Sequence, residues 1–149
     1  MRLLISSLAV LALAGSVQAQ DLTYNHPTRG GSALIENSDG KAFWVMLGEC
    51  AGVFGALSNE RYYENDQAGA DAFEADGTRQ ANAALAQLMQ DRGISRGDAA
   101  ALVRPAVERG RAFGEAQLAA APGRPQVRAV LSSACRDVDD AYARVRTSN

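Results

Sequence analysis

Few residues in this chain have a type and a setting that could support chemistry, and two of them are adjacent. Glu49 and Cys50 lie in the apolar stretch 42–57, AFWVMLGECAGVFGAL, in which Glu49 is the only charge. A carboxylate in apolar surroundings can serve as an acid or a base. No histidine or second fixed carboxylate accompanies Glu49, so a structural role is favoured. Its side chain would then point to the one solvated edge of a helix or pair with an arginine.

Cys50 and Cys135 are the only two cysteines of the chain. In an oxidising compartment, two cysteines in a small domain most simply form one disulfide. The alternative is a pair of metal-binding or reactive thiols, but the sequence has no Cys-x-x-Cys spacing to favour it. Because the bond would close a long loop, the chain-entropy model assigns it about 4–5 kcal/mol of stability.

Three further residues have side chains that can ligate metals or haem. His26 is the only histidine, and one histidine falls far short of the three or four ligands of a zinc site. Met46 and Met89 have no histidine on a helix to complete a haem or copper pair, so we expect them to fill the core. The sequence therefore predicts no catalytic residue, no metal site and no cofactor.

Tyr62 and Tyr63 lie in the polar stretch 58–66, SNERYYEND. They form either an exposed recognition patch or a partly packed helix end. Together with Glu49 they are the candidate binding residues of the chain.

The N-terminus has the pattern of a secretory signal peptide. Arg2 precedes the apolar run 3–14, and Val17-Gln18-Ala19 matches a small-x-small cleavage site. The run is shorter than the roughly 20 residues of a membrane-spanning helix. We therefore expect residues 1–19 to be removed, the protein to be exported to the periplasm or the extracellular space, and no stable membrane insertion.

Beyond the signal peptide the patterning is helical. Residues 20–37 have no steady period and are expected to form an extended or looped arm, whereas residues 38–149 are expected to form one helical domain. Apolar residues recur there at spacings of three and four in four segments, which predicts four helices. The fold class is therefore all-α, a small four-helix bundle-like domain in which a Cys50–Cys135 disulfide joins helices one and four. Two interruptions are expected, a break or a loosened turn near Gly77 and a kink or short break at Pro105.

The helix ends carry recognisable signals. Ser38 or Asp39 can cap the first helix and Ser95 the third. Gly93 can end the second helix in the left-handed conformation. Pro125 fits the first position of the fourth helix, where its missing N–H costs nothing.

The first helix carries a second pattern besides its core face. Gly48, Gly52 and Ala56 form a stripe of small residues four apart. Such a stripe predicts that a neighbouring helix approaches closely there. Because the segment is apolar nearly all round, we also expect it to be buried all round.

The net charge of the mature chain limits the kinds of partner that the protein is expected to bind. Cleavage removes only Arg2 from the 15 basic residues, which leaves 14 against 17 acidic residues and a net charge of −3. An acidic balance argues against nucleic acid or an anionic membrane as partner. The sequence favours a non-enzymatic exported protein, a binding or chaperone-like accessory of the cell envelope, whose partner is an envelope protein or a small apolar ligand. The alternative is a small enzyme with a carboxylate-centred site around Glu49.

Overall fold

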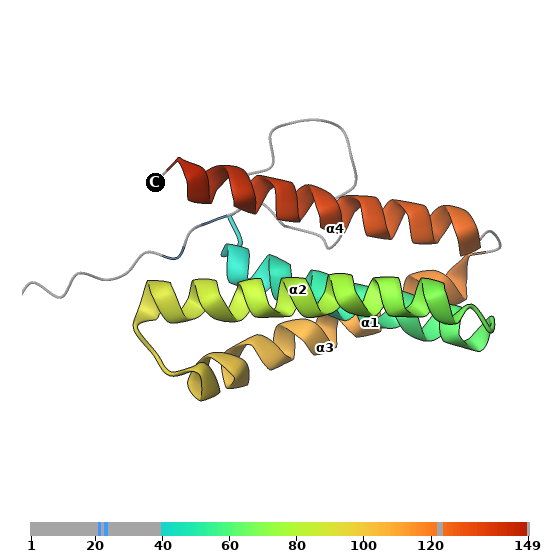
Figure 1. Cartoon of the computed structure of the whole chain (residues 1–149), viewed down its shortest axis with the longest axis horizontal. Coiled ribbons are helices and arrows are strands. Elements are labelled where there is room, and N and C mark those ends of the chain that lie inside the picture. Colours follow the sequence, from blue (N-terminus) through green and yellow to red (C-terminus); the bar gives the residue numbers. More distant parts are fainter. Residues whose placement is uncertain (1–20, 22, 24–39, 122–123, 149) are drawn as a thin grey trace, which may run out of the picture.

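A computed structural model of the chain describes residues 21, 23, 40–121 and 124–148, and these residues form four helices (Figure 1). Their bounds are α1 Phe43–Tyr63, α2 Gln67–Arg92, α3 Arg96–Ala120 and α4 Arg124–Thr147. Within the described ranges no strand forms; an isolated bridge pairs Thr23 with Ala42. The predicted all-α class is confirmed. The predicted signal peptide 1–19, nearly all of the arm 20–37, His26 and the caps Ser38 and Asp39 lie outside the described residues.

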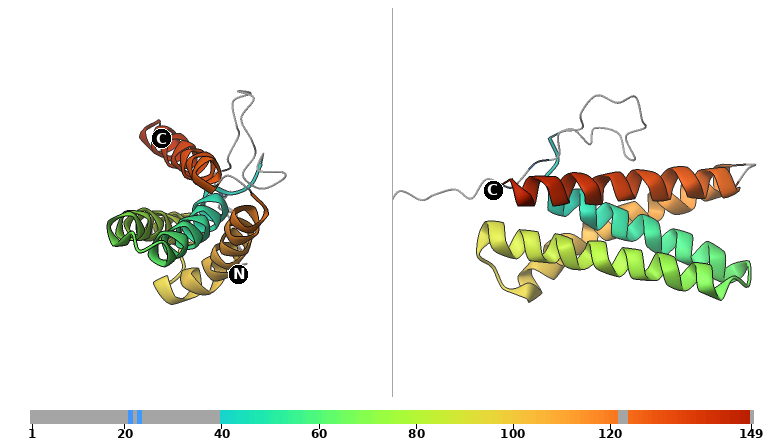
Figure 2. Two further views of the ribbon diagram at one scale, coloured as in Figure 1. Left: turned by 90° about the vertical axis from the view of Figure 1, so that its right-hand side faces the viewer. Right: turned by 45° about the horizontal axis from the view of Figure 1, so that its top comes forward.

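Helix α1 is the central helix. Seen end-on, it lies between α2, α3 and α4 (Figure 2, left). Residues 46–54 are all buried, without interruption over two and a half turns. The prediction that the apolar segment is buried on every side is confirmed for these nine residues, and the other helices pack around them.

The disulfide predicted from the cysteine count is present. Cys50 of α1 and Cys135 of α4 are bonded, with their Cα atoms 5.4 Å apart. Both side chains are buried, and their neighbours along α4 are the apolar residues Leu131 and Val138. Helices one and four are therefore neighbours, as expected.

The small-residue stripe of α1 faces α3. Gly48 faces Ala106, and Ala56 faces Gly114. Gly52 lies against the backbone of Val107 and Arg111, and Gly110 of α3 lies against the backbone of Glu49. The small residues of this contact are called the α1–α3 seam: Gly48, Gly52, Ala56, Ala106, Gly110 and Gly114. A Cβ on Gly52 would overlap the backbone of Val107, and a Cβ on Gly110 would overlap the carbonyl of Glu49. The backbones of the two helices are thus in direct contact, and the predicted close approach is confirmed.

The expected break near Gly77 is wrong. Helix α2 is continuous from Gln67 to Arg92. A Cβ on Gly77 would lie 3.2 Å from the carbonyl oxygen of Ala51 and from the Cβ of Phe54. Glycine stands here because α1 passes close by, and the packing compensates for its low helix propensity.

The short break considered at Pro105 is also absent. Helix α3 runs through Pro105 from Arg96 to Ala120. Proline leaves the carbonyl of Ala101 without its helical partner, but both residues are exposed, so water can satisfy that carbonyl.

The predicted helix-end signals are confirmed at Ser95 and Gly93, whereas Pro125 is the second and not the first residue of its helix. The Ser95 hydroxyl accepts a hydrogen bond from the Asp98 amide at 3.2 Å, and Gly93 ends α2 in the left-handed conformation with φ 62°. Helix α4 begins at Arg124, one residue before Pro125. Helix α1 is preceded by Ala42, which offers no side-chain cap.

Candidate functional site

Glu49 lies on α1 next to the α1–α3 seam. Its side chain is only 3% exposed, and each carboxylate oxygen faces a cation at 3.4 Å, Oε2 the Nζ of Lys41 and Oε1 the Nε of Arg109. The expected pairing of Glu49 with an arginine is therefore confirmed. The alternative expectation, that the side chain points to a solvated edge of the helix, is wrong. The carboxylate is covered because α3 crosses directly over its backbone at Gly110.

This arrangement limits what Glu49 can do. Both oxygens already have cationic partners, so the carboxylate is held as a structural ion pair near the seam. A catalytic carboxylate must reach a reacting group directly or through one water. In the described part of the chain, no three His, Cys, Asp or Glu side chains are grouped so that they could hold a metal ion.

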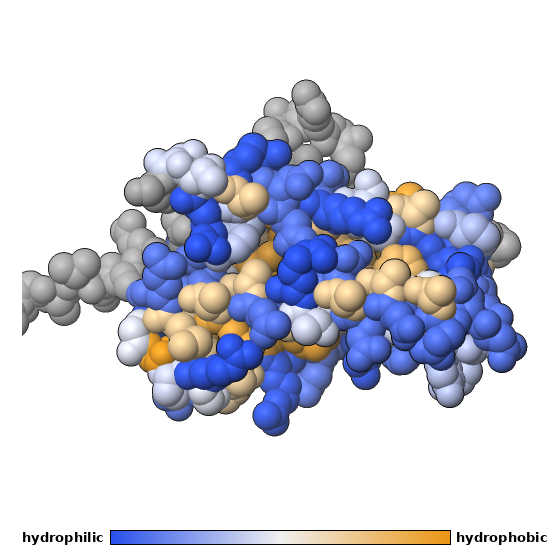
Figure 3. Space-filling model, viewed as in Figure 1, coloured by the Kyte–Doolittle hydropathy of each residue, from blue (hydrophilic) through white to orange (hydrophobic). Residues whose placement is uncertain are grey.

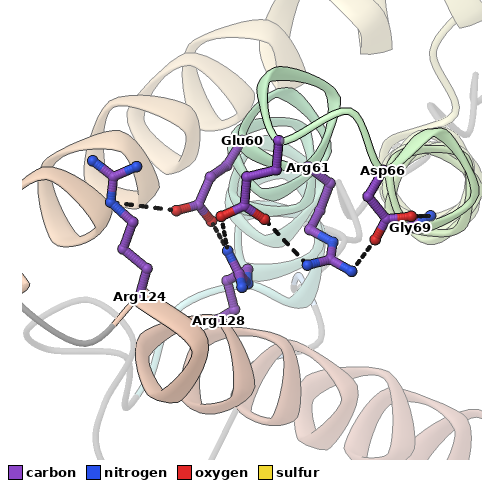
Figure 4. Close-up of polar contacts among 7 residues, drawn as sticks. Glu60, Arg61, Asp66, Gly69, Arg124 and Arg128 are labelled. Carbon is purple, nitrogen blue, oxygen red and sulfur yellow. Dashed lines mark hydrogen bonds and ion pairs between the residues drawn. The ribbon is translucent and has the colours of Figure 1, made fainter.

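A second group of charged residues fastens the C-terminal end of α1 to the start of α4 (Figure 4). We call it the helix-end cluster; its members are Glu60, Arg61, Glu64, Asp66, Arg124 and Arg128. The Nη1 of Arg128 donates to both Glu60 Oε2, at 3.0 Å, and Glu64 Oε1, at 2.9 Å. Arg61 pairs with Glu64 at 3.2 Å and also with Asp66. The cluster links three segments, α1, the α1–α2 turn and α4.

Electrostatics within the helix-end cluster are balanced, with three carboxylates and three guanidinium groups. The hydrogen bond from Arg128 holds the pKa of Glu64 below its ordinary value, and a second hydrogen bond from Arg61 acts in the same direction. Arg124 lies farther away, with its Nε 3.8 Å from Glu60 Oε1. The negative charge at this helix end is therefore neutralised from within the molecule.

Tyr62 and Tyr63 lie on α1 among these residues and point to solvent. Their exposed fractions are 62% and 82%, the largest among the exposed large hydrophobic residues of the described chain. Their rings meet edge-on, with centroids 6.1 Å apart. The pair is therefore exposed and not a partly packed helix end, while recognition through it stays a prediction. Since the tyrosines are 13 and 14 positions beyond Glu49, roughly 20 Å along the helix, the three candidate binding residues lie at two separate sites.

Elsewhere on the described helices, large apolar side chains are scarce at the surface. The face seen in Figure 3 is mainly hydrophilic, with hydrophobic residues interspersed between charged ones. Apart from the tyrosines, the large exposed hydrophobic residues are Leu102, at 42%, and Val130, at 54%. They lie on different helices, α3 and α4.

Two buried glutamines on α2 were not predicted from the sequence. Gln80 and Gln87 are 0% and 1% exposed and reach across to α4. Gln80 donates to the carbonyl of Cys135 at 2.9 Å, and Gln87 accepts from the Tyr142 hydroxyl at 2.8 Å. We call these four residues the α2–α4 seam. The seven-residue spacing of Gln80 and Gln87 is the only sequence signal that could have pointed to these two glutamines.

A contact near the other end of α1 was also missed. The carboxylate of Asp21 accepts hydrogen bonds from Arg92, at 2.7 Å, and from the Trp44 indole, at 3.2 Å. The hydrogen bond from Arg92 keeps the pKa of Asp21 below its ordinary value. The Arg92 guanidinium also lies over the Trp44 ring, 5.5 Å from its centroid. Asp21 thereby links α1 to the end of α2.

Comparisons of this chain with protein-family models, with curated proteins and with solved structures returned no match. Among the helices of the described residues, none combines the length and the apolar character that crossing a membrane requires.

Proposed function

We propose that this protein is an exported, non-enzymatic helical protein that binds another protein of the cell envelope through Tyr62 and Tyr63. The observation that carries the proposal is the exposure of two adjacent tyrosines on a helix end that the helix-end cluster holds in place. Tyrosine supplies a large contact area at low entropic cost and is enriched in protein interfaces. A fixed helix end reduces that cost further.

The balanced charge of the helix-end cluster supports a partner recognised by aromatic and hydrogen-bonding contacts. A partner drawn in by net charge would bind more weakly as salt increases, because ions screen exposed charges. We therefore expect binding at this end to depend little on ionic strength.

Export is supported by the disulfide, because such bonds persist in oxidising compartments. Intact mass spectrometry of the protein recovered from its native host tests this part. The expected mass lacks residues 1–19 and the two cysteine hydrogens. A full-length mass, or two free thiols, would contradict export with cleavage.

Site-specific photo-crosslinking in the native envelope tests the binding surface. A photoreactive phenylalanine analogue at position 63 should give a discrete crosslinked product that Tyr62→Ser weakens. The same analogue at Val130, an exposed apolar position on α4, is the matched control and should not give that product. Equal products from both positions, or none from position 63, would refute the proposed surface.

Glu49→Gln separates this proposal from an enzyme centred on Glu49. The amide keeps the shape of the side chain and removes its charge. A binding protein should keep its crosslinked product, because Glu49 lies roughly 20 Å from the tyrosines. Loss of the product in a variant with unchanged helix content would favour a functional role for the carboxylate.

A further inference from the structure

The buried groups between α1, α2 and α4 are arranged in two layers. In the first layer the disulfide joins Cys50 of α1 to Cys135 of α4. The amide of Gln80 on α2 completes this layer, because its Nε2 donates to the backbone carbonyl of Cys135 at 2.9 Å. Gln80 is fully buried. One residue from each of the three helices therefore meets at this level.

The second layer repeats the first. Phe43 of α1 lies against Tyr142 of α4 with ring centroids 5.5 Å apart, and the Tyr142 hydroxyl donates to Oε1 of Gln87 on α2 at 2.8 Å. On each helix the residue of the second layer lies seven positions from the residue of the first, about 10.5 Å along the axis. Both layers can form together only when α4 has a single position relative to α1 and α2.

The apolar face of α4 does not define that position by itself. Leu131, Val138 and Val145 are also seven residues apart. A shift of α4 by seven residues would therefore exchange one aliphatic side chain for another. Hydrophobic burial is non-directional, so it discriminates weakly between such registers.

Gln87 does discriminate between registers. A shifted α4 would leave its Oε1 buried without the Tyr142 hydroxyl, and an unpaired buried amide is costly. Gln80 bonds to a backbone carbonyl, which α4 offers in every register, so it holds α4 against α2 without choosing the register. A single buried polar residue sets the register of helices in other assemblies for the same reason.

We propose that Gln87, through its bond to Tyr142, sets the register of α4 before the disulfide forms and so brings Cys135 opposite Cys50, while Gln80 holds α4 against α2. Both glutamines are positioning residues. The oxidation then needs only an external disulfide: the two thiols lose two protons and two electrons, the Cys50–Cys135 bond forms, and the oxidant is reduced to two thiols. This inference is independent of the proposed binding surface.

The test measures the register through the cysteines themselves. The full mature chain is equilibrated in glutathione buffers, and the effective concentration of the Cys50–Cys135 pair is determined. The same measurement is made for a displaced pair, Cys50 with Val138→Cys in a Cys135→Ala chain. Position 138 lies three residues further along the same face, about 4.5 Å away. The ratio of native to displaced effective concentration reports the register of α4.

Gln80→Leu combined with Gln87→Leu should lower this ratio at least ten-fold, because the apolar replacements keep the volume and remove the directional bonds. Gln90→Leu, at an exposed position of α2, is the matched control and should leave the ratio unchanged. An unchanged ratio in the double variant, with native helix content by circular dichroism, would overturn the proposal.

A second variant keeps the test decisive if the double variant does not fold. Tyr142→Phe preserves the ring against Phe43 and removes only the hydroxyl that Gln87 accepts from. It should lower the ratio several-fold. If Tyr142→Phe kept the ratio measured for the parent protein, the second layer would not set the register.

Discussion

The α1–α3 seam and the α2–α4 seam join helices of one bundle in opposite ways. At the α1–α3 seam, glycine and alanine let two backbones touch, and the fit between helix surfaces determines how they pack. At the α2–α4 seam, the backbones stay farther apart, and two long amide side chains cross the distance between them.

Ion pairs beside the α2–α4 seam add to the difference between the two seams. The α2–α4 seam is bordered by ion pairs between the two helices, Arg79 with Asp139 at 3.3 Å and Asp76 with Arg136 at 3.6 Å. Such exposed pairs add little stability individually. Helices in backbone contact are thus specified mainly by the fit of their surfaces, whereas a helix held at a distance depends on directional polar contacts and, here, a covalent bond.

Removing the covalent bond should have the largest effect. The Cys50→Ser/Cys135→Ser variant should lose about 4–5 kcal/mol of unfolding free energy, because the unfolded chain regains the freedom of a long loop. Hydrogen exchange should show that α4 loses protection first, while α1 and α3 keep theirs. Urea denaturation measures the loss, and an unchanged midpoint would mean that the bond contributes nothing to stability.

Adding one methyl group to the α1–α3 seam should have the next largest effect. Gly110→Ala places a Cβ onto the carbonyl of Glu49, so the helices must separate. We expect a loss of about 3 kcal/mol, the upper range for overpacking. Gly97→Ala on the same helix is the control. A Cβ there meets only the Ser95 hydroxyl, at 3.8 Å, so stability should stay the same or rise slightly. Equal effects of the two substitutions would mean that the seam is not close-packed.

The smallest effect is expected at the α2–α4 seam. Tyr142→Phe removes one hydrogen bond and should cost about 1 kcal/mol at neutral pH. Burial raises the pKa of Tyr142 above its ordinary value of 10.0. Its neutral form therefore stabilises the folded state below pH 10, and this contribution is lost as the pH rises through the raised pKa. Thermal melts between pH 8 and 11 should show that the melting temperature falls more steeply with pH in the parent than in Tyr142→Phe. An equal fall in both proteins would mean that the ionisation of Tyr142 does not affect stability.

The sequence predicted the features that depend on local spacing. Apolar residues three and four apart predicted the helices, and two cysteines on core faces predicted the bond between α1 and α4. The stripe of Gly48, Gly52 and Ala56 predicted a close approach. Each of these predictions depends on the spacing of residues within one helix or on the reactivity of one residue type.

Features that depend on a distant segment were not predicted. Gly77 was interpreted as a break, because nothing local shows that α1 passes against it. Gln80 and Gln87 have the composition of surface residues and become buried only because α4 lies over them. The pairing of Glu49 with an arginine was expected, but neither Arg109 nor Lys41 could be chosen from among the cations of the chain.

The disulfide makes a covalent ring that contains all of α2 and α3. A protease that cuts a single peptide bond in the turn between α1 and α2, or between α2 and α3, therefore leaves two fragments that the disulfide still joins covalently. The fragments separate only when a thiol reductant opens the ring. A nicked copy of this protein thus loses no part of the chain and gains only the mass of one water, and on a gel the damage is visible only under reducing conditions.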